Sequence, residues 1–302
     1  MYLKKLGKQF VLLSMASLIA STAVAGKSEV SFDCDNPKGK TLGQVINKAK
    51  RGTTIKVSGL CQENIELRKR VNLDGQGIAT ITPADPSVST VWVGGVRKAK
   101  ISGFSIEAGE GSYGIIVTDD SFVTIENNTV TGGIYGIGAH GSSLVNIVGN
   151  TVSGATEYGI NVGENAYARI GFQTDGPSNV VNGNVIQNNQ QGILVLRAQA
   201  TIVSNQILNN LGNGIVVLND GTARVANNEI AGNNIGIVTI SNGGVDLALP
   251  TSTTDIITQP NYGINNTLAV YCNSGFMSGT IGSTNFLPFS QFFPPCENQT
   301  TP

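Results

Sequence analysis

A repeat of about 22 residues runs through the middle of this chain, and it constrains the fold more than any other feature. Glycines that precede an isoleucine recur at Gly114, Gly136 and Gly159, and again at Gly192, Gly214 and Gly236. The longer step between Gly159 and Gly192 equals one repeat plus an insertion at 171–181. A fixed period of this size predicts a solenoid, in which each repeat forms one coil that stacks on its neighbours.

Each repeat contains three short segments with strand character. The first is an aliphatic run after the glycine, as at residues 115–117, and the second alternates, as at Val123 and Ile125. The third ends in a single aliphatic residue such as Val130. A period of two indicates strands, and three strands within a single repeat are too short for the hairpins of a sandwich. The pattern therefore predicts an all-β coil of parallel strands.

One asparagine occupies the same place in successive repeats. Stacked parallel strands lie about 4.8 Å apart, so identical asparagines can hydrogen-bond from coil to coil as a ladder. Asparagine also tolerates the left-handed backbone conformation that a sharp corner needs. We therefore predict a structural asparagine ladder formed by Asn128, Asn150, Asn184, Asn205 and Asn228.

The repeat length, the three strands and the asparagine positions together resemble the right-handed parallel β-helix proteins of the pectin-lyase-like superfamily. The resemblance covers roughly residues 41–247. It implies a right-handed parallel β-helix solenoid with three strands in each coil of about 22 residues. It does not imply one activity, because the superfamily holds lyases, hydrolases, epimerases, esterases and adhesins.

The ends of the chain divide into distinct segments. Residues 1–25 have the features of a signal peptide, since Lys4, Lys5 and Lys8 precede a short apolar stretch that ends at Ala25. We expect cleavage after Ala25 and export to the periplasm or the outside; the alternative is an uncleaved membrane anchor. Residues 26–54 should hold an N-terminal segment and a capping helix over 41–50, and the β-helix should fill residues 55–247.

Residues 248–302 form a phenylalanine-rich tail. Six outward-facing aliphatic residues of the first strands would otherwise form one exposed patch, which proteins rarely leave in water. We therefore predict that the tail packs over this face and that the protein is a monomer. The alternative is a homo-oligomer that uses Leu194, Leu196, Val216 and Leu218. The complete patch consists of Leu194, Leu196, Val216, Leu218, Val238 and Ile240.

Four cysteines allow three pairings, and disulfides persist in exported proteins. Cys34 and Cys61 lie near one end of the chain, and Cys272 and Cys296 lie near the other. We therefore predict the disulfides Cys34–Cys61 and Cys272–Cys296. A single histidine and the lack of a Cys-x-x-Cys motif argue against zinc, so we expect neither a metal nor a cofactor.

The charge of the chain limits the classes of partner that it is expected to attract. Only 13% of the residues are charged and the net charge is −1. This balance gives no reason to expect attraction to nucleic acid or to an acidic membrane surface. After the signal peptide, no stretch is long and apolar enough to span a bilayer. The remaining candidate partner is a polysaccharide or a cell-surface glycan.

Two adjacent aspartates, Asp119 and Asp120, follow a first strand, and His140 comes one coil later. Glu164 lies one coil beyond His140, so Asp119 and Glu164 should be roughly 10 Å apart along the axis. This separation is at the upper edge of the range for two carboxylates that hydrolyse a glycosidic bond with inversion. On this hypothesis Asp119, Asp120 and His140 are catalytic, and the substrate-binding residues are Trp92, Asn161, Glu164 and Arg197.

The polygalacturonase branch of the superfamily gives the sharpest comparison. Its Asp-Asp pair is followed about one coil later by Gly-His-Gly, and here Asp119-Asp120 is followed by Ala139-His140-Gly141, which is similar. The third aspartate of that branch should fall near Gly94, where this chain has no carboxylate, and its Arg-Ile-Lys motif is missing. The basic residue of the lyase branch and the paired aspartate motifs of the esterase branch are also missing.

Two hypotheses therefore remain. In the first, the protein is an exported β-helix that binds polysaccharide or serves at the cell surface without catalysis; in the second, it is a glycoside hydrolase or lyase. The insertion at 171–181, read as a loop, resembles inserts in large bacterial surface β-helices and favours the first. The simpler explanation of Asp119 and Asp120 is solvated turn residues, that of His140 a stacking surface residue, and that of Trp92 a covered side chain.

Overall fold

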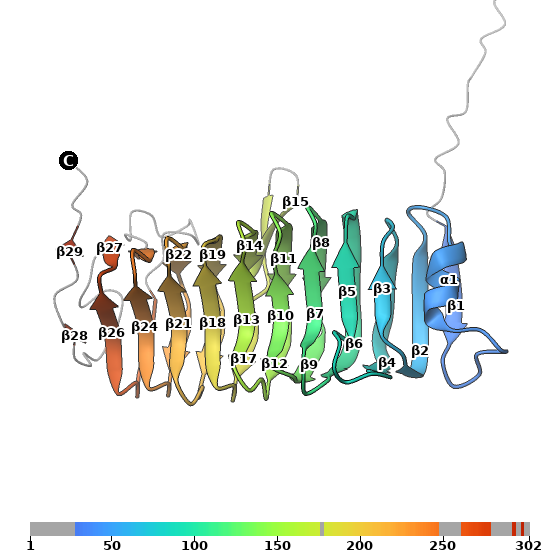
Figure 1. The fold of residues 1–302 in the computed structure, drawn as a ribbon, viewed down its shortest axis with the longest axis horizontal. Coiled ribbons are helices and arrows are strands. Elements are labelled where there is room, and N and C mark those ends of the chain that lie inside the picture. The colour runs from blue at the N-terminus through green and yellow to red at the C-terminus, as the bar shows by residue number, and fades with distance from the viewer. Residues whose placement is uncertain (1–27, 176–177, 248–260, 279–291, 294–296, 299–302) are drawn as a thin grey trace, which may run out of the picture.

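The structure is a computed structural model that describes residues 28–175, 178–247, 261–278, 292–293 and 297–298. The predicted signal peptide and its cleavage site after Ala25 lie outside these residues. The described chain winds into one elongated stack of coils, with the N-terminal end blue and the C-terminal end red in Figure 1. The expected all-β parallel solenoid with three strands per coil is confirmed.

The first strand of each coil contributes to a ten-stranded parallel sheet, which faces the viewer in Figure 1. The stack order follows the chain order, because each coil adds one strand beside the previous one. The strands are β3 (Ile65–Leu67), β5 (Val91–Gly94), β7 (Tyr113–Thr118), β10 (Tyr135–Ala139), β13 (Tyr158–Gly163), β18 (Gln191–Leu196), β21 (Asn213–Leu218), β24 (Ile235–Ile240), β26 (Leu268–Asn273) and β28 (Phe292–Phe293).

The second and third strands form one 17-stranded sheet. They join because the long strands of the first coils run round a corner, so that β6 pairs with both β8 and β9. The strands are β1 (Glu29–Asp33), β2 (Thr54–Gln62), β4 (Asn72–Thr82), β6 (Arg97–Ala108), β8 (Phe122–Glu126), β9 (Thr129–Gly132), β11 (Leu144–Val148), β12 (Thr151–Ser153), β14 (Tyr167–Ile170), β17 (Val185–Gln187), β19 (Gln199–Val203), β20 (Gln206–Leu208), β22 (Thr222–Ala226), β23 (Glu229–Ala231), β25 (Gly244–Leu247), β27 (Phe276–Ser278) and β29 (Glu297–Asn298).

The core is a set of stacked aliphatic side chains inside the coil. The isoleucines after the repeat glycines pair in register from strand to strand and are fully buried. Burial of each such side chain contributes about 1.5–3 kcal/mol to the free energy of unfolding. The sequence period thus places like residues on top of each other: Ile115, Ile137, Ile160, Ile193, Ile215 and Ile237.

An asparagine ladder lies within the stack. The Asn150 Nδ2 donates to Asn184 Oδ1 at 3.0 Å and to the Ile125 carbonyl at 2.9 Å. The same linkage joins Asn128 to Asn150, Asn184 to Asn205, and Asn205 to Asn228. A second ladder, which the sequence analysis missed, links Asn189, Asn210, Asn233 and Asn266. Because these side chains are buried, each unmade hydrogen bond would cost about 1–3 kcal/mol.

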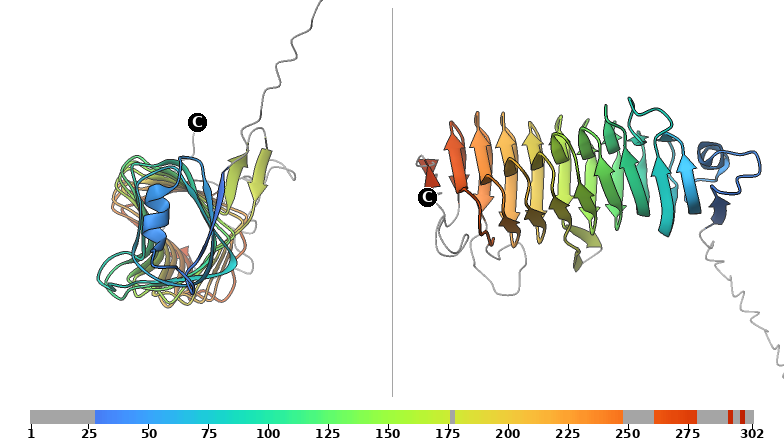
Figure 2. Two further views of the ribbon diagram at one scale, coloured as in Figure 1. Left: turned by 90° about the vertical axis from the view of Figure 1, so that its right-hand side faces the viewer. Right: turned by 90° about the horizontal axis from the view of Figure 1, so that it is seen from below.

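Helix α1 (Leu42–Lys48) lies at the N-terminal end of the stack, where Figure 2 shows it across the opening of the first coil. Thr41 is its N-cap, and the Thr41 side chain accepts from the backbone N–H of Gln44 in a capping box. Leu42 and Ile46 are buried against the core. The predicted disulfide Cys34–Cys61 is confirmed and ties this end of the chain to β2.

At the C-terminal end, the described part of the tail extends the stack. Strand β26 pairs with β24, and β27 pairs with β25. Asn228 Nδ2 donates to Asn261 Oδ1, so the first asparagine ladder also continues past residue 247. For residues 261–278 the prediction that the tail lies over the outer face is therefore wrong. The physical reason is that the backbone groups of an edge strand need pairing, and this chain supplies a further coil to pair them.

The rest of the predicted cover, residues 248–260 and 279–291, lies outside the described residues. Cys272 is disulfide-bonded, and its predicted partner Cys296 also lies outside them. The insertion, expected as a loop, contains an antiparallel hairpin of β15 (Phe172–Asp175) and β16 (Ser178–Val181). The hairpin projects from the stack, as the left view of Figure 2 shows. Phe172 anchors it by packing with Val203 and Ala226.

Candidate ligand-binding face

Three tyrosines form a ridge on the outer face of the ten-stranded sheet, and we call them the tyrosine ridge. Tyr113, Tyr135 and Tyr158 each stand directly before a repeat glycine, so they occupy one register position in three successive coils. The rings of Tyr113 and Tyr135 stack with centroids 4.6 Å apart, and those of Tyr135 and Tyr158 with centroids 6.4 Å apart. All three are half-buried, so part of each ring stays accessible.

Glycines at outward positions give the aromatic rings room to lie against the sheet. A Cβ atom placed on Gly138 would come 2.6 Å from Cε1 of Tyr113, because the phenol ring covers this glycine. A Cβ atom on Gly163 would come 3.3 Å from Cε1 of His140. Glycine in a strand often marks such a close approach. The rings are thereby held down on the face rather than projecting into solvent.

A cluster of polar side chains adjoins the ridge. The Tyr113 hydroxyl lies 3.3 Å from His140 Nε2 and accepts from Asn161 Nδ2 at 3.2 Å. The rings of Tyr113 and His140 meet edge to face with centroids 5.6 Å apart. Asn161 Oδ1 is buried and has no hydrogen-bond partner in the described part of the chain. These contacts link β7, β10 and β13 on the outside of the coil.

Two glutamates flank the ridge from opposite ends of these strands. Glu157 accepts from the Tyr135 hydroxyl at 2.6 Å. Glu164 Oε2 lies 3.8 Å from His140 Nδ1, and its side chain is 69% exposed. The His140 side chain is only 14% exposed, so the Glu164 carboxylate approaches it from the solvent side. Both carboxylates therefore remain accessible to a ligand at the edges of the aromatic surface.

Burial shifts the protonation of this cluster. Burial raises the pKa of the Tyr113 hydroxyl to about 12, although the hydrogen bond from Asn161 opposes the shift. Burial also raises the pKa of Tyr135 and of Tyr158. It lowers the pKa of His140 below its usual 6.5, and the nearby Glu164 carboxylate partly offsets this. At neutral pH the ridge therefore presents neutral phenols and a neutral imidazole.

Asp119 and Asp120 form the corner that follows β7. Both are exposed, with φ of +57° and +54°. The corresponding corners of the next coils repeat this left-handed turn at Gly141–Ser142 and Glu164–Asn165. Aspartate is one of the few residues that adopt this conformation readily. The turn alone therefore accounts for two adjacent aspartates at this position.

The aspartates and the histidine do not meet. An Asp119 carboxylate oxygen lies over Gly94, 2.7 Å from where a Cβ would stand, and Trp92 covers the same glycine. His140 instead leans toward Gly163 in the following coil. Among the described residues, no hydrogen bond or ion pair joins either aspartate to His140. The structure thus divides the predicted site residues into one group at Trp92 and another at His140, Asn161 and Glu164.

Trp92 is half-buried, and a cation covers one side of it. The guanidinium carbon of Arg68 lies 4.4 Å from the centroid of the indole, a cation–π contact. Arg197 is exposed at the corner after β18, and its side chain makes no ion pair within the described ranges. Its backbone carbonyl accepts from Asn165 at 2.8 Å. Arg197 therefore lies near Glu164 along the corner but does not pair with it.

The predicted aliphatic patch continues the face toward the C-terminus. Leu194, Val216 and Val238 are buried, with Leu196, Leu218 and Ile240 packed beside them. Tyr158 packs against the same cluster, so the tyrosine ridge adjoins the aliphatic patch.

Sequence reasoning missed the tyrosine ridge and Glu157. The signal was present, because Tyr-Gly-Ile occurs in three successive coils, at residues 113–115, 135–137 and 158–160, and once more at 262–264. The inward-facing isoleucine and valine explain the core of each repeat but not the residue before each glycine. An outward-facing residue does not pack in the core, so core packing does not explain why the same residue type recurs there. Its recurrence therefore indicates a role on the surface.

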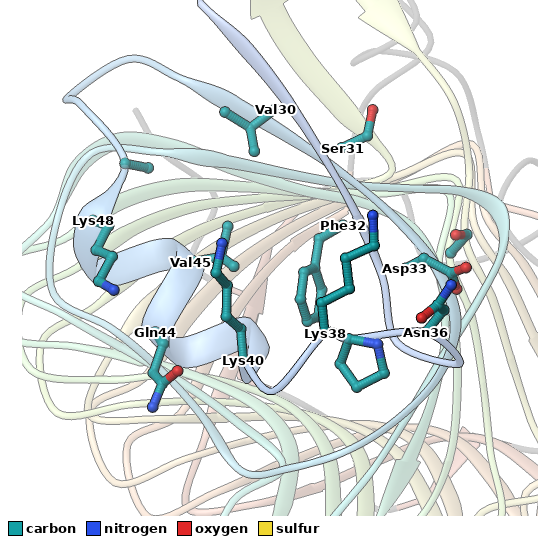
Figure 3. A pocket seen from close by; sticks show the side chains of 13 residues that line it. Val30, Ser31, Phe32, Asp33, Asn36, Lys38, Lys40, Gln44, Val45 and Lys48 are labelled. Atoms are coloured by element: carbon teal, nitrogen blue, oxygen red, sulfur yellow. The ribbon is translucent and has the colours of Figure 1, made fainter.

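A separate cleft of about 510 Å³ lies at the N-terminal end, between β1 and α1 (Figure 3). Phe32 and Val45 line it together with Lys38, Lys40 and Lys48. None of the predicted catalytic or substrate-binding residues lines this cleft. No group of three or more His, Cys, Asp and Glu side chains is placed to hold a metal ion in the part of the chain that the structure describes. Over those same residues, no helix has the length and apolarity needed to cross a bilayer.

Comparison with solved structures finds the same fold in other proteins. The chain is similar to the pectate lyase Pel9A, with a TM-score of 0.56 and 11% identity over 87% of this chain and 80% of that one. It is also similar to the enzymatically active domain of tailspike protein 2 of bacteriophage CBA120, with a TM-score of 0.54 and 12% identity. That match covers 85% of this chain and 44% of the tailspike chain. At these identities the likeness shows the fold alone.

No curated protein matches the sequence. The family model described as "Right handed beta helix region" matches residues 89–267, which is more than half of the chain. This range includes the tyrosine ridge and the asparagine ladders and ends just before β26. The chain therefore belongs to the right-handed β-helix family.

Proposed function

We propose that this is an exported β-helix protein that binds a polysaccharide along the outer face of the ten-stranded sheet without cleaving it. The tyrosine ridge is the observation that carries the proposal. The C–H faces of sugar rings are apolar, and they pack against the accessible parts of aromatic side chains. Tyr113, Tyr135 and Tyr158 supply three such rings in a row.

The dimensions of the ridge favour a chain over a single sugar. Three successive coils span about 10 Å between the first and last ring. The ridge follows the solenoid axis, because its tyrosines stand at one register position in three successive coils. A linear glycan that runs along the solenoid axis would place successive units on successive coils.

The polar groups beside the ridge fit sugar hydroxyls. Asn161 Oδ1 is an acceptor that the described residues leave unpaired, and Glu157 and Glu164 offer carboxylate acceptors at the two edges. Ligand sites commonly combine an apolar surface with a few placed polar groups of this kind. The neutral His140 can donate from one ring nitrogen and accept at the other.

Catalysis by Asp119, Asp120 and His140 has less support. The left-handed turn explains the two aspartates, and the Asp119 carboxylate lies over Gly94 beside Trp92 rather than at His140. Acid–base catalysis needs groups within reach of the same bond. A binding role requires only the surface that the tyrosine ridge provides.

The test uses the mature chain from Gly26 and a panel of uronic-acid and neutral polysaccharides in affinity electrophoresis. Tyr135→Ala removes the central ring and should weaken binding by at least about tenfold. Tyr262→Ala is the matched control, because Tyr262 is 47% exposed and lies far along the chain. If every polysaccharide retards Tyr135→Ala as much as it retards the wild type, the proposal is refuted.

The same panel tests the enzyme alternative. Reducing ends and unsaturated products should not accumulate with the wild-type chain. A double variant, Asp119→Asn with Asp120→Asn, should bind the glycan as the wild type does. Turnover that disappears in this variant would show that the aspartates are catalytic and would replace the proposed binding role.

A further inference from the structure

A basic cleft lies at one corner of the N-terminal coils, on a different part of the chain from the tyrosine ridge. Its volume is about 470 Å³, and Gly95 and Val96 form part of its lining. All its other lining residues are cations, in a chain that has only 19 lysines and arginines. These six, which we call the basic corner, are Arg51, Arg68, Lys69, Arg70, Arg97 and Lys98.

The topology brings these residues together from three turns of chain. Arg51 precedes β2, Arg70 lies between β3 and β4, and Arg97 begins β6. The backbone N–H of Gly52 donates to the Arg70 carbonyl at 2.7 Å, which fixes the first two turns side by side. Arg70 and Arg97 follow β3 and β5, where their coils leave the ten-stranded sheet, and Arg51 lies beside Arg70 after α1.

An irregularity in β6 adds Lys98 to the same corner. The register between β6 and β8 shifts between Arg97 and Ala99, so Lys98 is an extra residue at a bulge. Its φ is +64°, a conformation that costs a lysine free energy because its Cβ crowds the backbone. Bulges and strained residues of this kind often redirect a side chain at a binding site.

Two of the six cations already have partners. Arg68 Nε donates to Glu66 at 2.7 Å and its guanidinium covers Trp92. Lys69 Nζ donates at 2.8 Å to the carbonyls of Asn47 and Ala49, near the C-terminal end of α1. The positive charge of Lys69 suits that end of the helix.

The other four, Arg51, Arg70, Arg97 and Lys98, form no ion pair with any residue that the structure describes. All four are exposed. Like charges gathered in one cleft repel each other, and an anion bound there would relieve the repulsion. Salt bridges elsewhere on this molecule pair single cations with single carboxylates, as Lys56 does with Glu29. The basic corner is the departure from that pattern.

We propose that the basic corner binds a ligand that carries two or more phosphate groups close together. Guanidinium groups bind phosphate oxygens in a bidentate manner, and each phosphate brings more negative charge than a carboxylate. Three of the four unpaired cations are arginines. Net charge alone had argued against electrostatic recognition, but the folding of the chain concentrates the cations in one place.

The next coil limits the length of the ligand. Gly95 donates from its backbone N–H to the Asp119 carbonyl at 3.2 Å, so Asp119 occupies the same corner one coil further along. Asp119 and Asp120 put negative charge at that end of the cleft. A compact group of phosphates therefore fits better than a long polyanion that runs along the axis of the solenoid.

The experiment is calorimetric titration of the mature chain with inorganic tripolyphosphate at low and at raised salt. The triple variant Arg70→Gln, Arg97→Gln, Lys98→Gln should lose at least about tenfold in affinity. The control, Lys56→Gln, Lys100→Gln, Arg224→Gln, removes the same charge from cations that already have carboxylate partners. It should stay within about twofold of the wild type. Circular dichroism should show that both variants fold.

Three further measurements decide between sources and sites. If both triple variants lose the same affinity for tripolyphosphate, net charge alone explains the effect and the proposal is overturned. Polygalacturonate binding as tight as tripolyphosphate would overturn the preference for phosphate. Binding to vesicles that contain phosphatidylglycerol, without binding to soluble tripolyphosphate, would make the corner a membrane contact instead. Tyr135→Ala should leave tripolyphosphate binding intact, so that failure of the polysaccharide proposal is seen separately.

Discussion

The phenol ring of Tyr113 lies over Gly138 of the next coil, with ring Cε1 2.6 Å from the position that a Cβ atom would take on Gly138. This relationship seats one edge of the first ring of the tyrosine ridge against the sheet, while its face stacks on Tyr135. It also brings the Tyr113 hydroxyl to His140 and Asn161. One residue without a side chain thus organises the aromatic and polar parts of the candidate site.

Gly138→Ala should displace the Tyr113 ring. The new methyl group occupies space that the ring now fills, and the ring can swing toward solvent, so stability should fall by about 1 kcal/mol. The pKa of Tyr113, now raised to about 12 by burial, should move back toward its ordinary value of 10.0. Spectrophotometric titration of the tyrosines measures this change.

Gly163→Ala is the matched control for that substitution. A Cβ atom there would be 3.3 Å from the His140 ring, which needs to move only slightly. The tyrosine titration should therefore be unchanged in Gly163→Ala. Identical titration curves for Gly138→Ala and the wild type would contradict the placement of Tyr113.

Asn184→Ala should remove a central rung of the first asparagine ladder. The Asn184 side chain donates to Ile147 and Asn205, and it accepts from the backbone and side chain of Asn150. Loss of these buried bonds should lower the free energy of unfolding by about 2–4 kcal/mol. Denaturant melts would measure it.

Asn182→Ala provides the comparison, since Asn182 is exposed and its side chain donates to Asn127. Its cost should stay below about 0.5 kcal/mol. Similar losses for the two substitutions would mean that the buried ladder contributes no more than a surface contact.

The protonation of His140 should make stability depend on pH. Burial lowers its pKa in the folded chain below the 6.5 of the unfolded chain. The unfolded state therefore takes up the proton first as the pH falls. The contribution of the neutral His140 is fully present above pH 6.5 and is lost as the pH falls through the folded pKa.

His140 is the single histidine, so its NMR titration is unambiguous. Glu164→Gln should lower its pKa further, because the Glu164 carboxylate favours the imidazolium. Glu157→Gln, which removes a carboxylate bonded to Tyr135 instead, should leave it almost unchanged. A folded-state pKa above 6.5 would show that His140 is less buried than the structure has it.

At Asp119 the glycine variant should be more stable than the alanine variant, and at Asp246 the order should be reversed. Asp119 has a φ of +57°, where glycine is unstrained and alanine is not, so Asp119→Gly should be about 1 kcal/mol more stable than Asp119→Ala. Asp246 lies in β25 and should show the reverse order. Thermal melts of the four variants would test this, and the same order at both positions would speak against the left-handed turn.

The Cys34–Cys61 disulfide should stabilise the N-terminal end. It closes a loop with a sequence separation of 27 residues, for which chain entropy gives about 3.5 kcal/mol. The double variant Cys34→Ser, Cys61→Ser should lose about that much, and hydrogen exchange should quicken first in β1 and α1. Two free thiols at these positions in the mature protein would disprove the pairing.

The solenoid could be predicted because its evidence is local and repeated. Stacking places residue 115 on residue 137 and on residue 160, so each period adds an independent observation of the same coil. The tail was harder, because the step from Asn228 to Asn261 on the ladder is 33 residues and the strand pattern between them is broken. Asn261 and Asn266 nevertheless marked two ladder positions that could have been recognised.

The sequence by itself determined the coil, its three strands, the buried ladder and the residues available on each outer face, because these follow from periodicity. Only the tertiary structure decided which side chains meet, since ring orientation depends on the space left by glycines in neighbouring coils. It placed Asp119 with Trp92, joined His140 to Tyr113, aligned three tyrosines and gathered the cations at one corner. Those contacts join residues of neighbouring coils and depend on side-chain directions that spacing along the chain does not specify.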